Sequence, residues 1–193
     1  MKNILMNPFE TQTEQKLLSV GISAALVASV LAYFLNARFD GLFDMHFTTQ
    51  IEMFHPLIDN GINILLSALV LFGIGKYINK KTRFVDVLAV AAVARIPYYP
   101  LMFVNVKGFM KAATDVMMAN ANPENIGNIP PTSLAIILCF ALVAIAAIIW
   151  YIMLLYRGFK VATNAKGNSA LGLFIIAVFI IEFLTKLSIN YII

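Results

Sequence analysis

Long, continuous runs of apolar residues alternate with short polar connections along the chain. Each of five runs is long enough to cross about 30 Å of hydrocarbon as a helix. Membrane strands would need alternating inward and outward residues, whereas these runs are apolar throughout. A helix also satisfies its own backbone polar groups in lipid. The predicted spans are residues 17–37, 56–78, 84–106, 131–156 and 169–193.

The spans predict an all-α, polytopic membrane protein with a simple domain organisation. A short tail, residues 1–16, precedes one five-helix domain, residues 17–193. The first run is longer than the apolar part of a signal peptide and no convincing cleavage site follows it, so we expect it to remain as a helix. Small residues recur every three or four positions along this helix and are expected to face the bundle interior; they are Gly21, Ala25, Ser29 and Ala32.

Two longer connections, residues 38–47 and 109–117, show apolar residues at helical spacing beside charged ones. This pattern predicts short amphipathic helices lying in the plane of the lipid headgroups. Such helices cap the bundle, or they roof a cavity or dock a partner; the pattern fits each of these.

Composition agrees with the spans, because 61% of residues are hydrophobic and only 12% are charged. The net charge of +4 is not a nucleic-acid signal, since the basic residues lie in the connections. Nine Lys and Arg residues fall on one side of the predicted membrane and three on the other. We therefore expect a cytoplasmic N-terminus and an outer C-terminus, in the inner membrane if the source is bacterial.

No pattern in the sequence predicts catalysis, a metal or a cofactor. The single cysteine, Cys139, rules out an internal disulfide and a thiolate zinc cluster. His46 and His55 match no closed zinc spacing. Phosphate loops, dinucleotide fingerprints and hydrolase motifs are absent. We expect a protein that is not an enzyme.

Two charged residues lie deep within the predicted spans. Arg95 is about 17 Å into the third helix, just before Pro97, which should break that helix. Glu182 reaches a similar depth in the fifth helix. We predict an Arg95–Glu182 ion pair, with Lys186 as a competing partner for the glutamate.

The predicted pair has a structural and a functional interpretation. In the first, it fixes the register of two helices. In the second, it belongs to a polar site for an anionic or protonatable ligand, lined also by Tyr98, Tyr99 and Asn63. Asp86 and Asp59 each lie in the first turns of a helix, where the helix dipole favours a carboxylate.

The order of these features resembles the Yip1 domain family over nearly the whole chain. The residues that carry the resemblance are Asn7-Pro8-Phe9 in the tail, Phe84-Val85-Asp86-Val87-Leu88 and Pro97 in the third helix, Trp150 and Gly158-Phe159-Lys160 at the end of the fourth, and Gly167-Asn168-Ser169 before the fifth. The resemblance implies a five-helix fold with a cytoplasmic N-terminus. It also marks Asp86, Pro97, Trp150 and Gly158 as positions that matter.

Eukaryotic members of this family are linked to Golgi and endoplasmic-reticulum trafficking and to prenylated Rab GTPases. Those members have a long cytosolic N-terminal region, whereas about sixteen residues precede the first helix here. The chain looks more like compact prokaryotic members, which argues against Rab binding. The leading hypothesis is a membrane scaffold or adaptor that works on the bilayer, a membrane-protein partner or a second copy of itself. The rival hypothesis is a small transporter or channel around Arg95 and Glu182.

Overall fold

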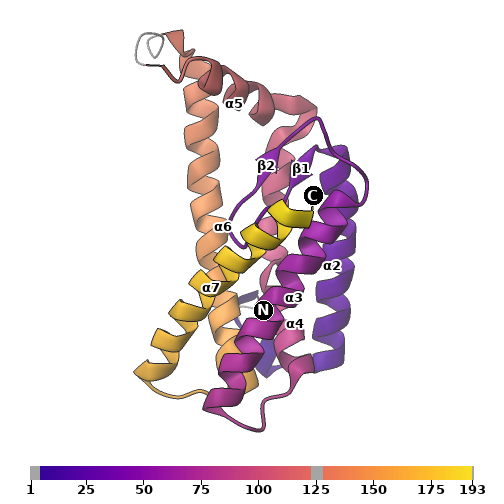
Figure 1. Cartoon of the computed structure of the whole chain (residues 1–193), viewed down its shortest axis with the longest axis vertical. Coiled ribbons are helices and arrows are strands. Elements are labelled where there is room, and N and C mark those ends of the chain that lie inside the picture. Colours follow the sequence, from indigo (N-terminus) through magenta and orange to yellow (C-terminus); the bar gives the residue numbers. More distant parts are fainter. Residues whose placement is uncertain (1–4, 123–127, 193) are drawn as a thin grey trace.

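Membrane-length helices make up most of the structure, a computed structural model that describes residues 5–122 and 128–192 (Figure 1). Within these residues it has five candidate spans, as predicted. Four are single helices: α2 (Glu14–Phe34), α3 (His55–Ile78), α6 (Pro131–Thr163) and α7 (Asn168–Ile192). The all-α fold class is confirmed. The last residue of the predicted fifth span, 193, lies outside the described residues.

The third span is not one regular helix. Its α-helical part, α4 (Phe84–Ala94), gives way to a 3-10 helix, η2 (Ile96–Gly108). Pro97 and Pro100 explain the change, because each lacks a backbone N–H and crowds the preceding turn. The predicted break at Pro97 is therefore confirmed, and the part of the predicted span after the break is a 3-10 helix and not an α-helix.

The predicted amphipathic helix of the second long connection is confirmed as α5 (Phe109–Ala119). Figure 1 shows α5 lying across one end of the bundle. The chain leaves the 3-10 helix at Val106 and Lys107, whose backbone angles are not helical, and α5 begins after Gly108, whose φ of 75° is easy for glycine. α6 also differs from its predicted end at residue 156, because Arg157 and Lys160 continue the helix beyond its apolar run.

The amphipathic helix predicted for residues 38–47 is wrong. The chain forms a small antiparallel hairpin instead, with β1 (Ala37–Arg38) paired to β2 (His46–Phe47). The residues between the strands, 39–45, enter the bundle, and we call them the plug (Figure 1). Phe39 and Leu42 are fully buried there, so their helical spacing reflects burial against protein. Irregular backbone at membrane depth is tolerated when protein surrounds it.

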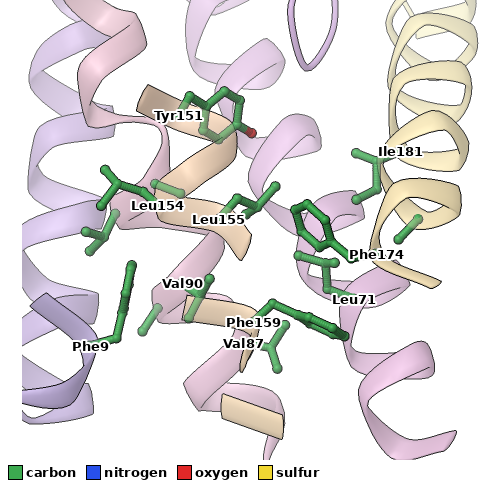
Figure 2. Packing of buried hydrophobic residues seen from close by; sticks show 14 of the residues in the cluster. Phe9, Leu71, Val87, Val90, Tyr151, Leu154, Leu155, Phe159, Phe174 and Ile181 are labelled. Carbon is green, nitrogen blue, oxygen red and sulfur yellow. The ribbon is translucent and has the colours of Figure 1, made fainter. Parts of the chain in front are cut away.

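The bundle has two ends that we name for use below. The plug end holds residues 35–54, and the basic end holds the connections 79–83 and 164–167. Near the basic end, apolar side chains of α3, α4, α6 and α7 form a continuous core (Figure 2). Phe9, from the short 3-10 helix η1 (Pro8–Glu10), joins this core beside Val90. Part of the N-terminal tail thus packs on the bundle.

The predicted inward stripe of α2 is confirmed, because its four small residues are all buried. At Gly21 the contact with α4 is especially close. A Cβ atom there would lie 2.6 Å from the Cβ of Ala92, which is closer than carbon atoms pack. Only glycine lets the two helices approach to this distance.

Candidate functional site

The plug end contains a buried ion pair that sequence reasoning missed. Nε and Nη2 of Arg38 each donate to a carboxylate oxygen of Asp59, both at 2.7 Å. The backbone N–H of Phe39 donates to the same carboxylate at 3.2 Å. The hydrogen bonds that Arg38 donates to Asp59 raise the pKa of Arg38. One signal for this pair was present in the sequence, because Arg38 and Asp59 lie on either side of the same connection. Their ion pair holds the hairpin against α3.

Glu182, on α7, binds the backbone of the plug. Its carboxylate accepts hydrogen bonds from the backbone N–H groups of Leu42 at 2.9 Å and Phe43 at 3.2 Å. Gly41 makes this approach possible, because a Cβ there would lie 3.1 Å from a carboxylate oxygen of Glu182. Lys186, the competing partner considered from sequence, lies 3.4 Å from Glu182 and 2.9 Å from Asp44.

Arg95 lies at the junction of α4 and η2 and is fully buried. Its charge faces aromatic rings: Cζ is 5.6 Å from the ring centre of Tyr98, 5.8 Å from that of Phe39 and 5.9 Å from that of Tyr151. None of its three guanidinium nitrogens has a hydrogen-bond partner among the described residues. Cation–π contacts are therefore the main attraction that this charge receives.

The predicted Arg95–Glu182 ion pair is wrong. Within the described part of the chain, the salt bridges of Glu182 include Lys186 and not Arg95. Equal depth was the basis of the prediction, but depth says nothing about which side of a helix a charge occupies. The plug supplies the rest of the reason, because its backbone donors take the carboxylate that Arg95 would need.

The other predicted lining residues gather around Phe39. Tyr98 and Tyr99 pack against its ring, with centroids 6.1 and 5.8 Å away, and Asn63 donates to its carbonyl oxygen at 2.9 Å. Sequence reasoning missed Tyr151 and Ser67, which come from α6 and α3. Several buried polar atoms here have no partner in the described structure: Oδ1 of Asn63, Oγ of Ser67, and the hydroxyls of Tyr99 and Tyr151.

The described residues contain no group of three or more His, Cys, Asp or Glu side chains arranged to hold a metal ion. His46 contacts the carboxylate of Asp40 within the hairpin, and this hydrogen bond raises the pKa of His46. His55 lies 3.8 Å from Glu52 at the start of α3. The two histidines therefore belong to separate local contacts.

At the basic end, Asp86 pairs with Arg83, as the distance of 2.7 Å between them shows. Arg83 also reaches Glu14 of α2, at 2.6 Å. The hydrogen bonds that Arg83 donates to Asp86 and Glu14 raise the pKa of Arg83. Arg83, which is exposed, thus links Asp86 in the first turn of α4 to Glu14 in α2.

A family model of the Yip1 domain matches residues 12–187, most of the chain. The chain belongs to the Yip1 domain family. No curated protein and no solved structure matches it. The Yip1 match agrees with the family named from the sequence, and it identifies the protein as a membrane protein of the Yip1 kind.

Four Yip1-like positions lie along the interface between the third span and α6. Asp86 and Gly158 line one cavity of about 150 Å³, which Phe9 also contacts. Pro97 and Trp150 line a second, larger cavity of about 490 Å³. Gly158 allows the helices to meet, because a Cβ there would lie 2.5 Å from Val90. Of the four positions, Gly158 thus sets how closely α4 and α6 pack in this Yip1-domain protein.

Proposed function

We propose that this Yip1-domain protein is a non-enzymatic membrane scaffold or adaptor that acts through lateral contacts of α6. The observation that carries the proposal is the exposure of that helix. Only 11% of its most apolar window is buried, against 72% for the third span. Apolar side chains therefore face outward along α6, including Leu142 and Val143. In a bilayer such a surface contacts lipid, a membrane-protein partner or a second copy of the chain, and the proposal is that a protein occupies it.

The closed interior supports the same proposal. Arg95 has no exposed surface, and the plug covers it through Phe39. A transport pathway would need access to such a charge from one side. The sequence supports a non-enzymatic role, since it contains none of the catalytic motifs considered above.

Cys139 gives a direct experiment. It is the only cysteine, and it is exposed on α6. A photoreactive maleimide attached to Cys139 in native membranes, followed by affinity purification and mass spectrometry, should capture a near-stoichiometric partner or a second copy. The matched control is Cys139→Ser with Val27→Cys, which moves the probe to an exposed position on α2. A protein recovered alone from Cys139, or equal capture from both positions, would contradict the proposal.

We infer that the basic end faces the cytoplasm, in the bacterial inner membrane if the source is prokaryotic. The support is the distribution of Lys and Arg, nine of which lie on the side of the N-terminal tail and three on the other. Impermeant thiol labelling of intact cells tests this. On a Cys139→Ser background, a cysteine in place of Lys81 should be protected and one in place of Met118 labelled, and the reverse result would refute the orientation.

A second candidate function rests on one observation, the lack of an acceptor for the guanidinium of Arg95 among the described residues. It is a small transporter or channel in which an anion enters this site after the plug moves. Proteoliposomes should then take up a small anion, and Arg95→Gln should abolish the uptake. Arg83→Gln is the control, because that arginine is exposed and paired. Uptake no faster than in empty liposomes would exclude this function.

A further inference from the structure

A basic recess lies where α6 ends and α7 begins. Its volume is about 680 Å³. Three cationic side chains, Arg157, Lys160 and Lys166, line it together with one carboxylate, Glu10. The recess therefore carries an excess of positive charge, and an anion fits it better than a cation.

Two of the cations are already held in place. Nη1 of Arg157 donates to the carbonyl oxygen of Met6 at 3.0 Å. The ammonium group of Lys160 lies 5.7 Å from the ring centre of Tyr156. Side chains held in this way lose less conformational entropy when a ligand binds. A guanidinium also offers a fork of donors that suits the oxygens of a phosphate group.

A separate apolar groove, the cavity of about 490 Å³ described above, precedes the recess along the same face of α6. Trp150 and Leu154 line the groove, and Arg157 lies seven residues after Trp150, which is about two helical turns or 10.5 Å further. Residues of the N-terminal segment line both spaces, with Leu5 and Pro8 at the groove and Asn7 at the recess. The indole N–H of Trp150 donates to the carbonyl oxygen of Leu5 at 3.2 Å.

An apolar groove followed, along one helix, by a basic recess at the helix end matches one class of ligand. We propose that this site binds an anionic phospholipid, with its phosphate at Arg157, Lys160 and Lys166 and an acyl chain against Trp150. The recess lies beyond the apolar part of α6, at the depth of the headgroups. Each basic residue near a membrane surface contributes about 1 kcal/mol toward an anionic lipid, or about fivefold in affinity.

Trp150 is the only tryptophan, and it is 38% exposed, so its fluorescence reports on the site. The full-length protein is reconstituted in vesicles that contain lipids with brominated acyl chains, which quench a tryptophan they touch. Brominated phosphatidylglycerol should quench Trp150 at a mole fraction at least about fivefold lower than brominated phosphatidylcholine. Equal quenching by the two lipids would overturn the proposal.

Two variants of equal charge identify the site. Replacing Arg157, Lys160 and Lys166 by Gln should remove the preference for phosphatidylglycerol. Replacing Lys76, Lys80 and Lys81 by Gln, at the same end of the bundle, should preserve it. The reverse pattern, or equal loss in both variants, would show a general surface effect and refute the site.

Inorganic phosphate separates a lipid headgroup from a free anion. It is added at constant ionic strength to the wild-type protein in the same vesicles. Quenching by phosphatidylglycerol should persist, because the acyl chain holds the lipid in the groove. Release of the quenching by phosphate would assign the recess to a free anion and overturn the proposal of a lipid.

Discussion

Two buried arginines in this protein are stabilised by different partners. Arg38 and Arg95 are 7% and 0% exposed. Arg38 makes a two-pronged ion pair with Asp59, whereas Arg95 faces three aromatic rings and has no hydrogen-bond acceptor among the described residues. Phe39 contacts both networks, through its backbone N–H to Asp59 and its ring to Arg95.

The difference shows that the partner of a buried arginine depends on which carboxylate lies within its reach. Asp59 lies near the start of α3, beside the hairpin, and meets Arg38 there. Glu182 is the corresponding acid in α7, but the backbone of the plug holds it. An arginine without a carboxylate is then retained only where electron-rich ring faces surround it.

The largest expected effect comes from Asp59→Ala. It leaves Arg38 buried and unpaired, which should lower the free energy of unfolding by about 3–5 kcal/mol. Denaturant or SDS titration of the purified protein measures this change. Asp115→Ala, which breaks the exposed pair with Lys111, should cost less than about 1 kcal/mol. Similar losses in the two variants would remove the special role of the Arg38–Asp59 pair.

Glu182→Ala should have an intermediate effect. It deprives two backbone N–H groups of the plug of their acceptor, at a cost of about 2 kcal/mol. The same titration measures the loss, and proteolysis at the plug should accelerate. Glu52→Ala is the control, because that side chain is exposed and makes one long contact with His55. Unchanged stability of Glu182→Ala would show that the plug does not depend on this carboxylate.

Arg95→Met should change the free energy of unfolding by less than about 1 kcal/mol. Methionine gives up the cation–π contacts but also removes a charge that has no counter-ion, and it fills much of the same volume. Thermal unfolding of the purified protein measures the difference. A loss of about 3–5 kcal/mol would instead mean that Arg95 has a strong ionic partner.

The smallest effect concerns pH at the hairpin. The hydrogen bond to Asp40 raises the pKa of His46 and the charge of Asp44 adds to this, whereas burial and the charge of Arg38 oppose the rise. A raised folded-state pKa gives stability that is complete below the unfolded value of about 6.5 and is lost as the pH rises through the folded value. The melting temperature should therefore fall slightly over this range. His46→Gln should abolish that dependence, and an unchanged dependence would assign it to another group.

Much of the fold could be predicted from the sequence, because long apolar runs have few structures in lipid. The break at Pro97 followed from the missing backbone donor. The plug could not be predicted, since helical spacing of Phe39 and Leu42 looks the same whether the apolar face meets lipid or protein. The hydrogen bond that holds the plug in place is also remote in sequence, because Glu182 lies 140 residues from Leu42.

Only part of the candidate site could be predicted, because the sequence indicates the depth of a residue in a span but not the direction in which it points. Arg95, Tyr98, Tyr99 and Asn63 gather around Phe39, and the burial of Arg95 followed from its depth in a span. The rotation of a helix about its axis decides which deep charges meet, and hydropathy carries little information on it. Glu182 was therefore assigned the wrong partner.

Two double-mutant cycles test the central contrast most directly. The first combines Arg38→Met with Asp59→Leu, and the second combines Arg95→Met with Glu182→Gln, each followed by the free energy of unfolding. We expect a coupling energy above about 2 kcal/mol for the first pair and below about 0.5 kcal/mol for the second. A strong coupling between Arg95 and Glu182 would contradict the account and restore the ion pair between α4 and α7.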